Sequence, residues 1–487
     1  MIKDQIKIHA GQSFELKLNF PQDDFSKRNS EFEMDMFLFL PPTLDINKHN
    51  FTRHDFYKSL KSYIRLASPD FELANLVDPD FFLNRELFES AEMIVKPGFS
   101  KPDDLFIRQL KDYVSIVNQS VSVEIRRLLQ DKNPDENETR IEEFVAQCYR
   151  FRRLFWYLME LIGERERSQS VVKAAALVDE YQSLMLESQL YVFINSLLSR
   201  YNEDHPVIVN LHHLVMAEMK YRKKVKYPSV ATENQLNEDI LHRRGRIKRY
   251  IESNLFLNTD TRKEGVFYEQ LFFSLAAGIA MVFATGIAFA SQYAFGNLTM
   301  PFFAVLVISY MFKDRIKELS RTYFDKQRKK MLFDFRTAIS IQKNDPIGTM
   351  RESFRFEKRS TLPPRISEAR ERMRVTEIRE EWIGDKVIHY KTKIKISSRQ
   401  LKKLSRFSGF TQIFRLNISP FTVKMDDHEK EVFIKSKKRL KRQVINRVYH
   451  LNLIFRFTAG DDQQYKYYKL ITDKKGVKRI DRIAFDD

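Results

Sequence analysis

The chain has 487 residues, of which 83 are basic and 65 acidic, so its formal net charge is +18. It contains 13 glycines and one cysteine. These counts exclude a disulfide scaffold, a collagen-like chain and most enzymes with a glycine-rich phosphate loop. The length predicts two or three domains, and a hydrophobic content of 43% indicates that they fold.

The charge is unevenly distributed along the chain. Residues 1–200 carry 26 basic and 32 acidic side chains, whereas residues 313–487 carry 45 basic and 23 acidic ones. An acidic front and a basic rear attract each other, and docking between them would occupy much of the basic surface. The single cysteine, Cys148, favours a reducing compartment for the folded parts.

Residues 1–50 are predicted to be an N-terminal β-strand region. Apolar and polar side chains alternate over residues 14–20 and again over residues 32–40, a period of two that is typical of half-buried strands. Residues 10–12 include Gly11 and predict a turn between the first two strands.

Residues 51–262 are predicted to form a cytoplasmic helical bundle. Thr52 and Asp55 have the spacing of a capping box, which marks a helix start. Further along, apolar residues at helical spacing predict a core-facing stripe: Phe144, Cys148, Phe151, Phe155, Leu158 and Ile162. Cys148 lies on this stripe and has no base nearby in the sequence, so we interpret it as a core residue and not as a nucleophile.

Residues 267–312 are predicted to form a transmembrane helical hairpin. Residues 271–290 contain no charge, and a second uncharged run covers residues 294–312. Twenty apolar residues match the thickness of a bilayer core, but the most apolar part of the second run, residues 300–312, is shorter, so re-entry is the alternative to spanning. A buried hairpin of a soluble protein is disfavoured, because core helices seldom run 20 residues without a charge.

Lysine and arginine residues flank both sides of the hairpin, which predicts that both flanks are cytoplasmic. The predicted location is therefore the cytoplasmic (inner) membrane, with a multi-pass topology and both termini in the cytoplasm. Small residues predict close helix packing within the membrane: Ala276, Gly278, Ala280, Ala284, Gly286 and Ala288. Packing inside one hairpin is preferred over a homo-oligomer, which stays an alternative.

Three segments follow the hairpin. Residues 313–342 are predicted to be a basic juxtamembrane helix, and residues 343–365, which contain three prolines and a glycine, a linker. Residues 366–487 are predicted to be a basic, antiparallel, β-rich cytoplasmic domain that ends in a meander with a hairpin turn at residues 473–476. The predicted fold class is an α+β membrane protein, with N-terminal strands plus a helical bundle, a two-helix transmembrane hairpin and a C-terminal antiparallel β domain.

Two groups of basic residues are candidates for binding an anionic partner. Residues 435–442 hold six positive charges, and a strand over residues 388–396 presents three lysines on its polar face. The candidates are Lys435, Lys437, Lys438, Arg439, Lys441, Arg442, Lys391, Lys393 and Lys395. Tethering beside the cytoplasmic leaflet favours anionic lipid headgroups, or an acidic protein, over nucleic acid as the partner.

No motif for catalysis, metal binding or cofactor binding is present. The glycines are too far apart for a Walker A loop, and the sequence lacks His-Glu-x-x-His, a cysteine pair and Gly-x-Ser-x-Gly. We therefore predict no catalytic, metal or cofactor-binding residues, and a non-enzymatic scaffold, sensor or regulator bound to the bilayer. The alternatives are a subunit of an oligomeric channel or transport assembly, a membrane-tethered nucleic-acid-binding protein, and an enzyme whose site is assembled from distant positions.

Overall fold

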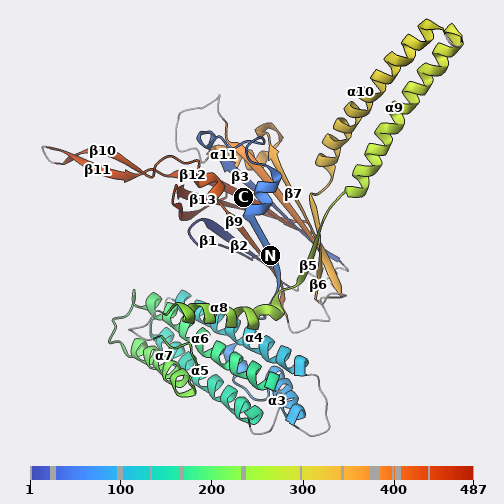
Figure 1. The fold of residues 1–487 in the computed structure, drawn as a ribbon. Helices are drawn as coiled ribbons and strands as arrows, with labels where there is room; N and C mark the ends of the chain where they lie inside the picture. Colours follow the sequence, from blue (N-terminus) through green and yellow to red (C-terminus); the bar gives the residue numbers. More distant parts are fainter. Residues whose placement is uncertain are drawn as a thin grey trace. The chain divides into compact units, whose positions relative to one another are not determined.

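The computed structural model divides the chain into two compact units (Figure 1). The β unit comprises residues 1–63, 258–403 and 412–487, and the helical unit comprises residues 64–257 and 404–411. The structure describes residues 3–21, 29–95, 103–131, 134–163, 169–231, 237–296, 299–341, 345–372, 384–397, 400, 407–436 and 439–485. The predicted mixture of helices and antiparallel strands is confirmed.

The β unit is built on an eight-stranded sheet with the order β14-β13-β12-β3-β8-β7-β6-β5, in which neighbouring strands run antiparallel. The predicted C-terminal meander and its hairpin turn are confirmed by β12, β13 and β14. The strands are β3 (Asn29–Leu40), β5 (Asn258–Lys263), β6 (Phe335–Ser340), β7 (Pro346–Glu357), β8 (Lys386–Ser397), β12 (Tyr449–Ala459), β13 (Asp462–Asp473) and β14 (Gly476–Ile483).

The N-terminal strand β3 lies between β12 and β8, in the middle of this sheet. The two β regions that the sequence suggests as separate domains therefore share one sheet. The alternation in β3 gives it two different faces: Met36 and Leu38 are buried on one face, while Phe37 and Phe39 are buried on the other. On that other face they pack with Ile366 of the short helix α11 (Pro364–Arg372).

A second sheet has the strand order β1-β2-β9-β4. Its strands are β1 (Lys3–His9), β2 (Ser13–Pro21), β9 (Gly409–Asn417) and β4 (Leu60–Ala67). The ring of Phe414 on β9 joins the two sheets, because it lies 5.4 Å from Tyr390 on β8. Within its own sheet, Phe414 lies 6.0 Å from Phe14 on β2. The helix α1 (Arg53–Ser59) begins at the predicted capping box of Thr52 and Asp55 and adds Phe56 to this aromatic layer, 5.4 Å from Tyr390.

Two predictions for the segment after the hairpin are wrong. The basic helix predicted for residues 313–342 is too long, because the second helix of the hairpin ends at Met331. Residues 335–340 form the strand β6 instead. The linker predicted for residues 343–365 contains β7 instead, an interior strand of the large sheet, and then a 3-10 turn, η4 (Arg359–Thr361). Prolines are typical of loops, but here they occupy the first positions of regular elements. Pro346 is the first residue of β7 and Pro364 is the first residue of α11, positions at which a missing N–H is tolerated.

Gly348 is required by the close approach of β7 to β8. A Cβ atom at this position would lie 2.4 Å from the backbone oxygen of Lys395. We therefore expect Gly348→Ala to lower the free energy of unfolding by about 1–3 kcal/mol, the usual cost of overpacking a close contact. Urea unfolding of the detergent-solubilised chain measures this. Gly384→Ala, at a position with open space around it, serves as the control, and equal losses in the two variants would contradict the steric explanation.

Two projections leave the β unit (Figure 1). One is a helical hairpin of α9 (Val266–Phe295) and α10 (Met300–Met331), which connects β5 to β6. The other is a two-stranded ribbon of β10 (Glu429–Ser436) and β11 (Arg439–Asn446), which connects the short helix α13 (Ser419–Thr422) to β12. A further 3-10 turn, η2 (Pro42–Leu44), follows β3.

The helical unit packs its long helices around α6. Its elements are α2 (Leu73–Leu76), α3 (Phe82–Val95), α4 (Asp103–Gln130), α5 (Pro134–Gly163), α6 (Gln169–Leu197), α7 (Pro206–Val225), α8 (Glu238–Glu252) and η3 (Ser253–Leu255). All six residues of the predicted apolar stripe on α5 are buried in its core, Cys148 among them. Burial raises the pKa of the Cys148 thiol above its usual range, which agrees with a core residue and opposes thiolate chemistry.

A network of charged side chains is buried between these helices. The Arg152 guanidinium on α5 donates from Nη1 to Oδ1 of Asp179 on α6 at 3.1 Å, and from Nε to Oε1 of Glu218 on α7 at 2.9 Å. The hydroxyl groups of Tyr221 and Tyr227 both donate to Oδ2 of Asp179. Burial alone would lower the pKa of Arg152, but the charges of Glu218 and Asp179 hold it above its ordinary value. The network therefore ties three helices together through buried ion pairs.

Candidate membrane hairpin and the cavity at its root

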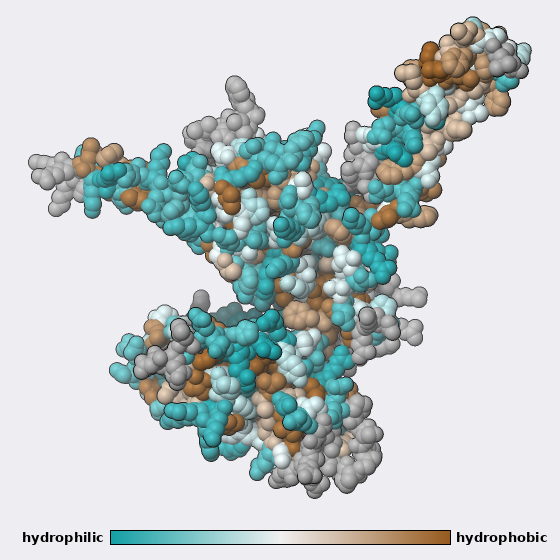
Figure 2. All heavy atoms as spheres, viewed as in Figure 1, coloured by the Kyte–Doolittle hydropathy of each residue, from teal (hydrophilic) through white to brown (hydrophobic). Residues whose placement is uncertain are grey.

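Helix α9 exposes an apolar surface over most of its length. Within the described residues it is the one helix that is long and apolar enough to cross a membrane, over Glu269–Phe295, and only 11% of its most apolar window is buried. Figure 2 shows hydrophobic side chains along the outer part of the hairpin. Val282, for example, is 75% exposed. The prediction of two membrane helices is thus supported for α9 alone, and a membrane hairpin is not confirmed.

Helix α10 is not apolar over a long enough stretch to qualify as a membrane-spanning helix, because its apolar part ends at Phe312, directly before Lys313. The contacts between the helices fix their relative register. The hydroxyl of Ser309 donates to the carbonyl oxygen of Ala284 at 3.5 Å, and the rings of Phe272 and Phe324 stack at 5.3 Å. The charged half of α10 therefore lies beside the first half of α9. The length that is apolar on both helices is about 13 residues, or about 20 Å at helical rise.

The small residues of α9 divide between two faces. Ala276 and Ala280 are buried at the contact with α10, and Ala284 and Ala288 are half-buried. Gly278 and Gly286 are exposed, and no atom would lie within 4 Å of a Cβ added at either. The alanines thus allow α9 to approach α10 closely, whereas the two glycines lie outside that contact.

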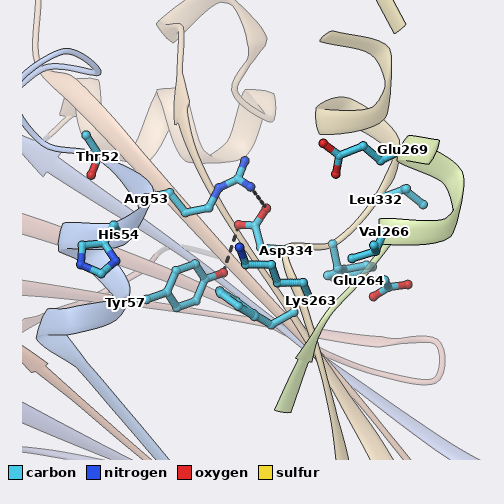
Figure 3. A pocket seen from close by; sticks show the side chains of 12 residues that line it. Thr52, Arg53, His54, Tyr57, Lys263, Glu264, Val266, Glu269, Leu332 and Asp334 are labelled. Atoms are coloured by element: carbon cyan, nitrogen blue, oxygen red, sulfur yellow. Dashed lines mark hydrogen bonds and ion pairs between the residues drawn. The ribbon is translucent and has the colours of Figure 1, made fainter. Parts of the chain in front are cut away.

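A cavity of about 480 Å³ lies at the root of the hairpin (Figure 3). It is lined by side chains from α1, from the end of β5, from the start of α9 and from the segment after α10. The lining residues are Thr52, Arg53, His54, Tyr57, Lys263, Glu264, Val266, Glu269, Leu332, Phe333, Asp334 and Phe335. The sequence does not mark any of these as a site residue, because they come from three distant segments.

Asp334 is the central polar group of this cavity. Its carboxylate accepts hydrogen bonds from the hydroxyl of Tyr57 at 3.1 Å and from the backbone N–H of Phe354 at 2.8 Å, and it pairs with Arg53 at 2.9 Å. Burial raises the pKa of Asp334 above its usual value, although these donors oppose the shift. Figure 3 shows Arg53 and Tyr57 pointing at Asp334 from α1. The carboxylate therefore fastens the chain after α10 to α1 and β7.

The neighbouring Glu352 on β7 belongs to the same polar cluster. Its carboxyl accepts a hydrogen bond from the hydroxyl of Tyr390 at 2.5 Å. Burial raises the pKa of Glu352, and the charge of Asp334 adds to the effect. At the rim, Glu264 pairs with Arg351. Asp334, Glu352 and Glu264 thus each interact with a neighbouring side chain of the β unit, which suits a rigid attachment of the hairpin. Among the residues that the structure describes, no three metal-binding side chains come together.

The three lysines predicted on the polar face of β8 are paired inside the sheet. Lys391 lies 2.7 Å from Glu33, Lys393 lies 2.7 Å from Glu31, and Lys395 lies 2.8 Å from Glu31. Hydrogen bonds from Lys393 and Lys395 lower the pKa of Glu31 to about 2. The acidic front and the basic rear of the chain do attract each other here, because β3 and β8 are neighbours. Each of these lysines is therefore already engaged in an ion pair, and two carboxylates offset most of the charge of the three lysines.

The same attraction occurs at Asp35, also on β3. His389 lies 2.8 Å from one oxygen of its carboxylate, and Arg456 lies 2.8 Å from the other. Burial alone would raise the pKa of Asp35, but the hydrogen bond from His389 and the charge of Arg456 hold it below its usual value. The face of the large sheet that the sequence suggests as free and basic is thus a ladder of ion pairs.

The remaining candidate residues lie on the β10–β11 ribbon. Lys435, Lys441 and Arg442 are exposed, and Arg442 pairs with Glu431 across the ribbon. Lys437 and Lys438 lie outside the described residues; Arg439 opens β11, but its side chain is not described. Within the described part of the chain, no ion pair involves Lys435 or Lys441. The candidates thus separate into a group on β8 whose lysines are all ion-paired and a more exposed group on the ribbon, in which Lys435 and Lys441 have no ion pair with a described residue.

Comparison with known protein families finds no match, and neither the curated proteins nor the solved structures contain a significant match.

Proposed function

We propose that the protein is anchored in a lipid bilayer by α9 and the apolar first part of α10, and that it serves as a non-enzymatic scaffold, sensor or regulator. The observation that carries this proposal is the exposed apolar surface of α9. Fully burying a side chain such as Val or Phe is worth about 1.5–3 kcal/mol, so a helix of this composition is strongly driven out of water. The hydrocarbon core of a bilayer supplies the missing burial.

A soluble core helix and a signal sequence can both have the composition of α9, but each fits the structure less well. The core helix of a soluble protein is mostly covered by neighbours, whereas the most apolar window of α9 is 11% buried. A signal sequence precedes the folded part of a protein, whereas α9 connects β5 to α10 inside the β unit. Lipid contact accounts for both the composition and the exposure.

The topology of the hairpin follows from its attachment. Strands β5 and β6 are antiparallel neighbours, and Lys263 at the end of β5 pairs with Phe335 at the start of β6. Both ends of the hairpin are thus held at one edge of one sheet, so both lie on the same side of the bilayer. The basic residues on either side favour the cytoplasmic side. The shared apolar length of about 20 Å is shorter than a bilayer core of about 30 Å, so a crossing hairpin has to thin the bilayer around it.

The anchor would hold a basic surface close to anionic lipid. Each Lys or Arg near such a leaflet is attracted by about 1 kcal/mol. The exposed cations of the ribbon, Lys435, Lys441 and Arg442, are the residues we assign to this contact, with an anionic headgroup or an acidic protein as the partner. We assign no part in it to the lysines of β8, because each of them is paired with Glu31 or Glu33.

Alkaline carbonate extraction of membranes that contain the full-length chain tests the anchor. We expect the chain to stay in the membrane pellet and to float with vesicles in a density gradient. The matched control replaces residues 265–333 by Asn-Gly, a two-residue turn suited to the antiparallel pair β5–β6. This variant should fold and be released into solution. Release of the full-length chain by carbonate would overturn the proposal.

A further inference from the structure

The β10–β11 ribbon exposes apolar side chains as well as charged ones. The structure places no third strand beside it within the described residues, and an isolated two-stranded ribbon is only marginally stable in water. Phe433 is 71% exposed and Leu440 is 75% exposed. Figure 2 shows hydrophobic side chains near the outer end of the ribbon, next to hydrophilic ones. Exposed apolar clusters of this kind mark surfaces that bind a partner.

The register shows that both faces of the ribbon are partly apolar. Residues directly opposite each other share a face, and Phe433 lies opposite Arg442 while Ile434 lies opposite Lys441. One face therefore carries Phe433, Leu440 and Val444, and the other carries Val432, Ile434 and Ile445. A protein groove covers one face of a ribbon and leaves the other in water. The interface of a bilayer surrounds an inserted ribbon and accepts both faces.

The net positive charge of the ribbon favours a bilayer that contains anionic lipid. Residues 429–446 contain seven basic and two acidic residues. Lys435 lies opposite Leu440, and Lys441 lies opposite Ile434, so cations and apolar side chains occupy the same rungs near its outer end. Lysine and arginine stems can lie along apolar surface while their charged heads reach the headgroups. This composition fits the interface of an anionic bilayer, where negatively charged headgroups lie next to the apolar acyl chains.

We propose that the ribbon is a second membrane contact, which inserts Phe433, Ile434 and Leu440 into the interface of an anionic bilayer while Lys435, Lys441 and Arg442 contact the headgroups. This inference rests on the proposed function, because the α9 anchor keeps the β unit at the bilayer. It names a lipid surface as the partner of the ribbon, in preference to an acidic protein. Tethering makes a weak contact sufficient, since the second binding step is intramolecular.

The test uses the full-length chain in vesicles of phosphatidylcholine, with or without phosphatidylserine. An environment-sensitive fluorophore is attached to Leu440→Cys, and in a control protein to Asp461→Cys in the exposed turn between β12 and β13. The native Cys148 is buried and does not compete for the label. We expect a blue shift of the Leu440→Cys label, and its quenching by lipid-borne quenchers, only when phosphatidylserine is present. The Asp461→Cys label should not change.

Two further variants separate insertion from charge attraction. These variants and their parent protein are all labelled at Ile434→Cys, an inserting position that neither variant changes. Phe433→Ser with Leu440→Ser keeps every cation, and Lys435→Glu with Lys441→Glu keeps every apolar residue. We expect each pair to remove most of the phosphatidylserine-dependent shift. If only the variant with Lys435→Glu and Lys441→Glu loses the phosphatidylserine-dependent shift, the proposed insertion of apolar side chains is overturned. A label that responds to added polyglutamate and not to the vesicles makes the partner an acidic protein and also overturns the proposal.

Carbonate extraction of the same vesicles keeps the two proposals distinct. A chain that is released by carbonate lacks the α9 anchor. A chain that is retained while the Leu440→Cys label stays in water has the anchor, and its ribbon is not a membrane contact.

Discussion

Replacing Val282 with lysine is expected to prevent stable membrane integration of the chain. Val282 is 75% exposed, and it lies at the middle of the apolar span Glu269–Phe295 of α9. A lysine near the centre of a membrane helix costs about 2.5–3.5 kcal/mol on insertion scales, and adding Phe289→Lys should increase this cost further. In water, by contrast, the same exposed position would accept lysine with little effect. The carbonate-resistant fraction of the chain measures the outcome.

Leu319→Lys is the matched control for this prediction. Leu319 is 70% exposed, close to the value of Val282, but it lies in the charged half of α10. We expect this variant to integrate as the unmodified chain does. If both variants integrate equally well, the apolar tip of the hairpin is not embedded in lipid.

Replacing Arg152 with alanine is expected to cause the largest loss of stability in the helical unit. The substitution leaves the buried carboxylates of Asp179 and Glu218 without their ion-pair partner. Breaking a buried ion pair by removing one partner typically costs about 3–5 kcal/mol. The guanidinium also lies over the rings of Trp156 and Tyr221, at 5.4 and 5.2 Å from their centroids, so its packing is lost as well.

The fluorescence of Trp156 reports on this region directly, because its ring stacks on Tyr221 at 5.0 Å. The second tryptophan, Trp382, is replaced by phenylalanine, and urea unfolding is followed in detergent. Arg140→Ala removes an ion pair with Asp131 on the surface of the same unit, and we expect it to cost less than about 1 kcal/mol. Similar losses for the two arginine variants would show that the buried network contributes no more than a surface pair.

Local patterns account for the elements that the sequence predicts correctly. The helical spacing of Phe144, Phe151 and Phe155 places them in the core because a 3.6-residue period puts them on one face of α5. The period of two in β12, and the glycine at the turn before β14, predict the C-terminal meander in the same way. The linker prediction at β7 fails because Pro346 and Gly348 resemble loop residues, although each fits a specific place in an interior strand.

The candidate site could be predicted only in part. The uncharged run of α9 and the basic residues of the ribbon are continuous in the sequence, so both are visible without a structure. The cavity at the root of the hairpin is not visible in the sequence, because Asp334 and Tyr57, which form a hydrogen bond there, are 277 residues apart in the chain. No local period or motif reports such a contact.

Composition and short-range spacing are enough to predict most of the local elements, the long apolar run of α9 and the excess of positive charge toward the end of the chain. Which of those charges are exposed depends on how distant segments pack together. Strand β3 pairs with β8, so Glu31 and Glu33 form ion pairs with Lys391, Lys393 and Lys395, whereas Lys435 and Lys441 are exposed on a ribbon with apolar side chains on both faces. Pairing between strands more than 340 residues apart in the chain depends on how whole faces fit together, and that information is absent from any single segment.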